Sequence, residues 1–180
     1  MKLLPNLLST ARLALAPWLF ALLWHRQYGT SLIVIFIAGV TDGLDGLIAR
    51  NFEAASKLGA YLDPVADKVL LSGTFLTLAL DGSVAKWLAV IVLGRDVLIL
   101  LFAAIAFLFT SLRSFPPSIW GKASTAAQIA YILVLLAHFD NFLSQNSVKP
   151  FEYLTAILTV WSFLHYAWTA RRLFHHTASS

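Results

Sequence analysis

The apolar positions of this chain gather into six long runs, and a short polar or turn-forming segment separates each run from the next. A membrane-spanning helix needs about 20 largely apolar residues, and each run is close to that length. The pattern therefore predicts an all-α bundle of six transmembrane helices. The predicted helices are residues 7–25, 31–50, 58–80, 85–110, 119–139 and 151–171.

The segments between the runs contain residues that commonly end or start helices. We expect a turn with an N-cap at Tyr28–Ser31, a polar link at 51–56 and a turn at Asp81–Ser83. Ser114–Ser118 contains two prolines and is expected to end one helix and cap the next. Residues 140–150 are expected to form the longest polar loop.

Composition agrees with a membrane protein, because 59% of the residues are hydrophobic, 12% are charged and the mean hydropathy is +0.76. The 180 residues suffice for one domain, spanning 1–180. No basic stripe with interleaved aromatic residues is present, which argues against a nucleic-acid partner. The opening is expected to be an uncleaved first helix, since Arg12 interrupts its apolar run.

The distribution of lysine and arginine predicts the orientation of the bundle, because cytoplasmic loops are rich in both. Arg26, Lys86 and Lys149 fall on one side of the predicted helices. Eight basic residues fall on the other side: Lys2, Arg12, Arg50, Lys57, Arg113, Lys122, Arg171 and Arg172. We therefore place both termini in the cytoplasm, in what we expect to be a bacterial inner or plasma membrane.

Five of the nine acidic residues lie within one stretch of 26 positions, and four of these are aspartates, Asp42, Asp45, Asp63 and Asp67. A carboxylate inside a membrane is costly and marks a functional site by default. On helices that turn about 100° per residue, each pair falls on one face. Two such faces joined by a short turn would surround one acidic cavity at the cytoplasmic side. Hard oxygen ligands of this kind suit Mg²⁺ or Mn²⁺.

Small residues share these two faces. Gly46 and Ala49 lie with the first pair of aspartates, followed by Arg50, and Gly59 and Ala66 lie with the second pair. Small side chains let a backbone or a flat ligand approach closely, although the same residues also serve ordinary helix packing. Arg50 fits both a cytoplasmic anchor and a ligand-binding role.

The full pattern is Asp-x2-Asp-Gly-x2-Ala-Arg-x8-Gly-x3-Asp-x3-Asp, which resembles the signature of the CDP-alcohol phosphatidyltransferases. All eight of its positions are matched: Asp42, Asp45, Gly46, Ala49, Arg50, Gly59, Asp63 and Asp67. The resemblance extends with lower specificity from Pro5 to about Gln128.

The resemblance implies that a phosphatidyl group passes from CDP-diacylglycerol to an alcohol and that CMP is released. It implies that Asp42, Asp45 and Asp63 bind one or two Mg²⁺ or Mn²⁺ ions, with two ions expected. It implies that Asp67 is the general base and also contacts metal. A direct displacement without a covalent intermediate is the expected route.

The resemblance also implies binding sites for both substrates. Asp45, Gly46, Ala49, Arg50 and Gly59 would form the cytidine and pyrophosphate pocket. The resemblance also places Asn6 and Thr10 near the nucleotide. These two residues could instead cap a helix or contact the membrane interface.

The resemblance places Arg95, Lys122 and Arg12 near the acceptor's phosphate, and cationic donors suit such an anionic group. Arg95 and Asp96 also fit a buried ion pair, and the two roles can coexist. Lys122 also fits an interfacial lysine at a helix start. Lys68 is expected to neutralise the site or to extend to the interface.

Two acceptors remain, phosphatidylglycerol, which gives cardiolipin, and glycerol 3-phosphate, which gives phosphatidylglycerophosphate. The Gly94–Leu98 stretch resembles the cardiolipin synthases more closely. Residues 99–109 carry no charge, and Ser124 stands where the glycerophosphate enzymes often have Lys. A dianionic phosphomonoester should require more cations than a phosphodiester. The sequence therefore favours phosphatidylglycerol.

Two other classes of protein, a divalent-cation transporter and a non-catalytic scaffold, agree less well with the sequence than an enzyme does. A divalent-cation transporter would carry polar residues through the membrane, whereas here the carboxylates cluster at one end. A scaffold would not need all eight signature positions. The resemblance also implies a homodimer embedded among membrane lipids.

Overall fold

The computed structural model describes the backbone of residues 3–52, 57–109 and 118–177. It describes the side chains of residues 10–11, 13–40, 68–101 and 118–169. Within the described backbone all regular structure is helical, which confirms the all-α prediction. The helices are α1 Leu3–Trp24, α2 Tyr28–Phe52, α3 Lys57–Leu80, α4 Lys86–Phe109, α5 Ile119–Phe139 and α6 Gln145–Thr177.

The turn predicted at Tyr28–Ser31 lies earlier in the chain than expected. The chain reverses at residues 25–27, where Arg26 adopts a positive φ of 57°. The Gln27 amide then bonds to the Leu22 carbonyl at 2.9 Å. The Ser31 hydroxyl donates to the Gln27 carbonyl at 2.8 Å. The prediction was wrong because these polar residues stabilise the first turn of α2 and do not interrupt it.

The loop predicted at residues 140–150 is shorter than expected, because α6 begins at Gln145 and contains Pro150. The side chain of Val148 is buried in the core and fixes the first turn of this helix. The neighbouring Lys149 is exposed and pairs with Glu152 at 2.9 Å. The mostly polar residues 145–149 therefore form the start of a helix, and their composition misled the prediction.

The turn after α3 and the start of α5 lie where the sequence predicts them. Gly82 adopts a φ of 82° in the turn after α3, a conformation that glycine tolerates without steric cost. Ser118 caps α5, and its hydroxyl accepts a hydrogen bond from the Gly121 amide at 3.0 Å. Residues 114–117 of the expected turn and residues 53–56 of the expected polar link lie outside the described residues, whereas residues 51 and 52 of that link still belong to α2.

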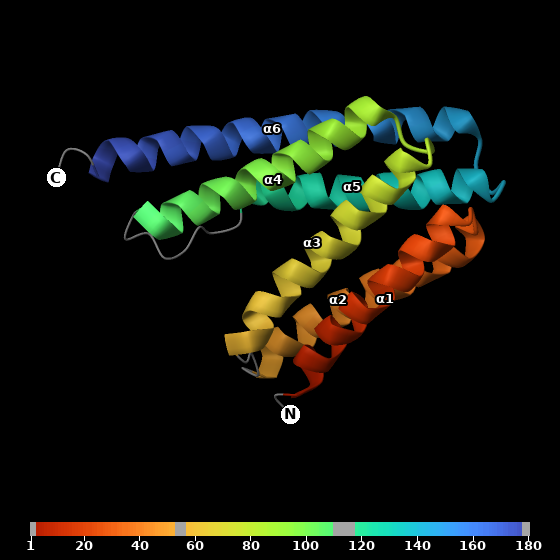
Figure 1. The fold of residues 1–180 in the computed structure, drawn as a ribbon, viewed down its shortest axis with the longest axis horizontal. Helices are drawn as coiled ribbons and strands as arrows, with labels where there is room; N and C mark the ends of the chain where they lie inside the picture. The colour runs from red at the N-terminus through yellow and green to blue at the C-terminus, as the bar shows by residue number, and fades with distance from the viewer. Residues whose placement is uncertain (1–2, 53–56, 110–117, 178–180) are drawn as a thin grey trace.

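The helices form two groups of three, α1–α3 and α4–α6 (Figure 1). Among the described residues, the main contacts close a ring in the order α1, α3, α4, α6, α5 and α2. The two groups meet where α3 is followed by α4, and they diverge toward the end that holds both termini (Figure 1). The end of α2, which follows the signature aspartates of that helix, lies at this diverging end (Figure 1).

The opposite end of the bundle is held together by contacts between its turns. Asp81, between α3 and α4, pairs with Arg26 at 3.1 Å and accepts a hydrogen bond from the Tyr28 hydroxyl at 3.1 Å. The Tyr28 ring also stacks on Phe139 at the end of α5, with the ring centroids 4.6 Å apart. These contacts fix the relative positions of the turns after α1, α3 and α5.

Apolar side chains fill the inside of the ring toward this closed end. Phe75 of α3 stacks on Tyr131 of α5, with centroids 6.1 Å apart, and both residues are fully buried. Leu78, Leu88 and Leu136 surround this pair and are also fully buried. The polar residues described next lie between this core and the diverging end.

The outer surface of the bundle is strongly apolar. Large hydrophobic side chains are exposed on all six helices, among them Trp18, Phe36, Leu76, Val90, Ile119 and Ile157. Within the described residues, Ile119–Phe139 is long and apolar enough to cross a membrane, and three shorter apolar helical stretches are found on α1, α2 and α3.

Candidate functional site

The signature residues lie on two helices, as the sequence predicts. The backbone of α2 is helical through Asp42–Arg50, and that of α3 is helical through Gly59–Asp67. The spacing of each aspartate pair therefore corresponds to neighbouring turns of a helix. The side chains of these residues lie outside the described set, so their predicted roles remain predictions.

The first helix runs parallel to α3 at a definite register. The Phe20 ring lies against Gly73, where an added Cβ would stand 2.2 Å from the ring's Cζ. Arg26 pairs with Asp81 at 3.1 Å. These two pairs are offset by 53 and 55 residues, so the same offset brings residues 6–12 of α1 level with residues 59–67 of α3. This register agrees with the predicted place of Asn6, Thr10 and Arg12 near the signature.

Of these three residues, only Thr10 has a described side chain, and it is exposed. The side chains of Asn6 and Arg12 lie outside the described set. The nucleotide contacts predicted for Asn6 and Thr10, and the acceptor contact predicted for Arg12, therefore remain predictions.

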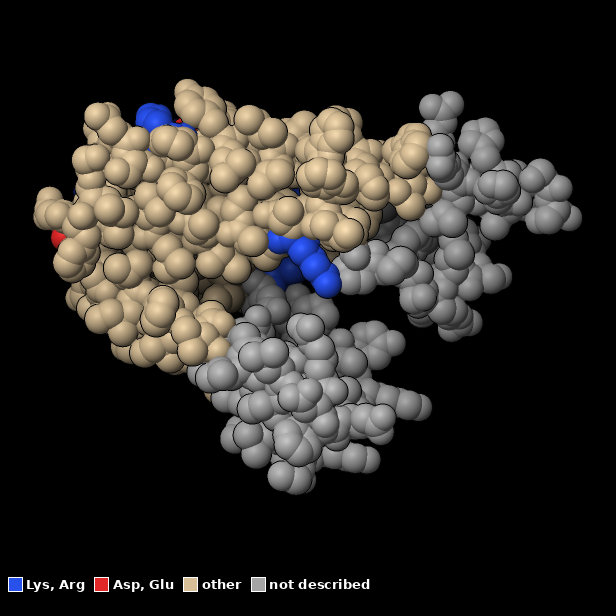
Figure 2. All heavy atoms as spheres, turned by 180° about the vertical axis from the view of Figure 1, so that it is seen from behind, with Lys and Arg blue, Asp and Glu red and all other residues tan. Residues whose placement is uncertain are grey.

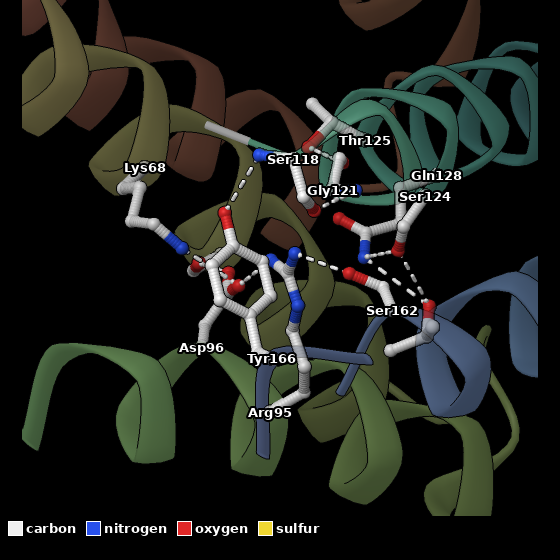
Figure 3. A network of polar contacts seen from close by, with 12 residues as sticks. Lys68, Arg95, Asp96, Ser118, Gly121, Ser124, Thr125, Gln128, Ser162 and Tyr166 are labelled. Carbon is white, nitrogen blue, oxygen red and sulfur yellow. Dashed lines mark hydrogen bonds and ion pairs between the residues drawn. The ribbon is translucent and has the colours of Figure 1, made fainter. Parts of the chain in front are cut away.

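A buried ionic cluster lies directly after the signature (Figure 3). Lys68, which follows Asp67 in the chain, donates from Nζ to Oδ1 of Asp96 at 2.7 Å. Arg95 donates from Nη1 to the same oxygen at 2.7 Å, and the Ser72 hydroxyl donates to Oδ2 at 2.9 Å. One carboxylate thus joins α3 to α4 and accepts three hydrogen bonds.

The predicted pair of Arg95 and Asp96 is confirmed, and it is almost completely shielded from solvent. Each side chain is 8% exposed, whereas that of Lys68 is 34% exposed. Arg95 also donates from Nη2 to the Ser162 hydroxyl of α6 at 3.0 Å, and its buried Nε has no hydrogen-bond partner among the described residues. The guanidinium therefore links α4 to α6.

The α5–α6 interface near this cluster carries a seam of hydroxyl and amide groups. The Ser124 hydroxyl bonds to the Thr159 hydroxyl at 3.1 Å, and the Gln128 amide donates to the Ser124 and Thr159 hydroxyls at 3.3 and 3.4 Å. All three side chains are buried. Ser124 thus holds α5 against α6.

Two residues at the start of α5 complete the described part of the site. Lys122, predicted to contact the acceptor, is exposed. The backbone amide of Ser118 donates to the Tyr166 hydroxyl of α6 at 3.2 Å. This contact fixes the start of α5, and with it Lys122, relative to α6.

The described charges near the signature are predominantly positive. Asp96 balances one of the two charges on Lys68 and Arg95, and Lys122 adds a further cation. On the face opposite to that of Figure 1, basic side chains lie in a hollow of the described surface (Figure 2). Such a cluster is suited to anionic groups such as phosphates.

The residue types of the signature fit a divalent metal. Four carboxylates on two adjacent helical segments provide the hard oxygen ligands that Mg²⁺ and Mn²⁺ prefer. Among residues with described side chains, no group of three acidic, histidine or cysteine residues forms a metal site. The predicted ligands Asp42, Asp45, Asp63 and Asp67 all lie outside that set.

Sequence reasoning singled out Arg95, Lys122 and the signature, but it did not find several residues of this region. The sequence could have indicated the pairing of Lys68 with Asp96, because each is a charged residue within an otherwise apolar helix. No sequence feature indicated the roles of Ser72, Ser162 and Tyr166, because isolated hydroxyl groups are common in such helices. Their roles follow only from the packing of α3, α4 and α6.

Comparison with known proteins places this arrangement in a family. A family model described as CDP-alcohol phosphatidyltransferase matches residues 2–168. A CDP-diacylglycerol–glycerol-3-phosphate 3-phosphatidyltransferase of Haemophilus influenzae is 31% identical, with 93% of each chain covered. The human cardiolipin synthase (CMP-forming) is 30% identical over 91% of this chain, which spans 61% of the human protein.

The cardiolipin synthase (CMP-forming) of Streptomyces coelicolor is 33% identical over 74% of this chain and 65% of its own length. The family match covers nearly the whole chain and includes every signature position. The chain belongs to the CDP-alcohol phosphatidyltransferase family and is a transferase.

Proposed function

We propose that the chain transfers a phosphatidyl group from CDP-diacylglycerol to phosphatidylglycerol, which forms cardiolipin and releases CMP. The family membership supports the reaction class. The observation that favours this acceptor is the lack of charged residues at 99–109, on the helix that carries Arg95 and Asp96. Ser124, at a position that often carries Lys in glycerophosphate enzymes, is fully buried and holds α5 to α6.

The proposed roles of the signature follow from its chemistry. Mg²⁺ or Mn²⁺ held by Asp42, Asp45, Asp63 and Asp67 would neutralise the pyrophosphate and stabilise the departing CMP. Asp67 takes the proton from the acceptor hydroxyl. The resulting oxygen attacks the phosphorus that carries the diacylglycerol, and the bond from that phosphorus to the CMP oxygen breaks.

Other residues bind and orient the two substrates in this proposal. Gly46, Ala49 and Gly59 leave room for the nucleotide, and Asp45, Arg50, Asn6 and Thr10 contact it. Arg95, Lys122 and Arg12 lie near the acceptor's phosphate.

A bilayer location is part of the proposal. Exposed apolar side chains on every helix are unusual for a soluble protein and fit contact with lipid. We place both termini and the signature at the cytoplasmic side of a bacterial membrane, on the distribution of Lys and Arg. A homodimer, implied by the resemblance, is also expected.

The packing inside the ring favours an enzyme over the divalent-cation transporter. Phe75, Tyr131 and their apolar neighbours fill the closed end of the bundle. A polar path across the bundle would have to pass through this core. The polar groups near the signature are therefore better suited to a pocket that opens at one side.

A second acceptor, glycerol 3-phosphate, is favoured by a specific observation. The Haemophilus influenzae relative, whose name specifies that acceptor, matches 93% of both chains. Both proposals use the same donor and the same residues for chemistry, and they differ only in the acceptor.

Release of CMP by the purified protein separates the two acceptors. The protein in detergent receives CDP-diacylglycerol and Mg²⁺ or Mn²⁺, with either phosphatidylglycerol or glycerol 3-phosphate. We expect CMP with phosphatidylglycerol. CMP with glycerol 3-phosphate alone would show that the cations near the signature suffice for a phosphomonoester, and the cardiolipin proposal would be wrong.

A further inference from the structure

We propose that Lys68 is an additional phosphate-binding residue, and that Asp96 positions it. This inference rests on the proposed transferase function, because it assigns a residue to the substrates of that reaction. Neither the signature nor the predicted acceptor contacts include Lys68 or Asp96.

The exposure of the basic side chains indicates which of them is accessible to a substrate. Arg95 is 8% exposed, and two of its nitrogens bond to Asp96 and Ser162. Lys68 is 34% exposed, and among the residues with described side chains it bonds to Asp96, at 2.7 Å. An ammonium group has three donors, so Lys68 retains N–H groups for an anionic ligand. Its position directly after Asp67 brings it close to the proposed chemistry.

Asp96 is arranged to hold the Lys68 side chain in place. A lysine side chain is flexible and loses much conformational entropy when it is ordered. The buried carboxylate fixes the ammonium through Oδ1, and its own position is fixed by Arg95 and the Ser72 hydroxyl.

The net charge of the cluster supports a phosphate ligand. One carboxylate faces two cations, so the group carries one excess positive charge. Charge-assisted hydrogen bonds to phosphate oxygens are among the stronger polar contacts in proteins. The phosphate belongs either to the pyrophosphate of the donor or to the acceptor, and kinetics with each substrate varied in turn distinguishes these two sources.

The test compares Lys68→Met and Lys68→Arg with the wild type, and uses Lys86→Met as a matched control. Lys86 is an exposed lysine at the start of α4, in the closed half of the bundle. We expect Lys68→Met to raise KM for one of the two substrates by roughly 10- to 100-fold, because it removes a hydrogen bond to a charged group. The Lys68→Arg variant should recover part of this loss, and Lys86→Met should leave both KM values unchanged.

Asp96→Asn tests the positioning role with Lys68 intact. We expect the same substrate to show the raised KM, with a smaller change in kcat. Thermal unfolding and donor binding measured by calorimetry provide readouts besides activity. Lys68→Met should keep a Tm near that of the wild type, because Asp96 remains paired with Arg95, and should weaken calorimetric donor binding only if the phosphate is the donor's.

Three outcomes would overturn the inference. Lys68→Met with both KM values within about twofold of the wild type would show that Lys68 is structural. A loss of kcat with unchanged KM values would place its effect on the chemical step. An Asp96→Asn variant with normal kinetics would remove the positioning role. A wild-type protein that releases no CMP with either acceptor would instead refute the proposed function itself.

Discussion

Phe20 of α1 packs directly on Gly73 of α3, and a Cβ at residue 73 would stand 2.2 Å from the ring's Cζ. The two helices approach so closely because residue 73 has no side chain. This contact sets the register between α1 and the signature half of α3. The packing of two ordinary apolar helices thus determines where residues 6–12 lie relative to residues 59–67.

Gly73→Ala should destabilise the protein by about 1–3 kcal/mol, because the added methyl group forces the Phe20 ring out of its position. Thermal unfolding in detergent measures the effect. Gly39→Ala is the control, since a Cβ at residue 39 meets nothing within 4 Å. A double variant with Phe20→Leu should recover part of the loss. Equal stabilities for the two alanine variants would contradict the close contact.

The cap of α5 provides a second stability prediction. Ser118→Ala removes the side-chain acceptor for the Gly121 amide and should cost about 1 kcal/mol. Ser118→Asp retains an acceptor and should remain near the wild type. Denaturant titration measures both variants. If Ser118→Ala is as stable as Ser118→Asp, the capping interaction contributes nothing measurable.

The ion pair at the closed end predicts a dependence of stability on pH. Burial by itself raises the pKa of Asp81, but hydrogen bonds from Ser83, Tyr28 and Arg26 outweigh burial and lower the pKa below its usual value. A carboxyl group whose pKa is lowered in the folded state stabilises that state above the unfolded pKa of about 3.9. This stabilisation is lost as the pH falls through the folded pKa.

The difference in Tm between the wild type and Asp81→Asn should therefore be largest near neutral pH and should shrink as the pH is lowered below about 4. Thermal scans from neutral to acidic pH measure this difference. A difference that stays constant across the range would show that the charge of Asp81 does not stabilise the turns.

Much of the helical fold could be predicted from sequence, because long apolar runs separated by turn-forming residues correspond to successive helices. All six helices were found, and Ser118 was correctly placed as a cap. The failures at Tyr28 and Gln145 have one cause. Polar residues start a helix as readily as they interrupt one, and the difference depends on tertiary contacts such as the burial of Val148.

Some residues of the candidate site could be predicted from the sequence, and others could not. The aspartates of the signature have fixed spacing, so their placement on α2 and α3 follows from helical periodicity. The pairing of Lys68 with Asp96 joins residues 28 positions apart, and that of Arg95 with Ser162 joins residues 67 apart. No local pattern specifies such pairs, since they depend on how α3, α4 and α6 pack.

The central claim is that the signature aspartates carry out a metal-dependent transfer with Asp67 as the base. The most direct measurement is CMP release from CDP-diacylglycerol and phosphatidylglycerol by the wild type and by Asp67→Asn, with binding of Mn²⁺ and donor measured in parallel. The wild type should release CMP only when a divalent metal is present. Asp67→Asn should lose turnover while it still binds metal and donor. Turnover near the wild-type level in Asp67→Asn would contradict the assignment of the base.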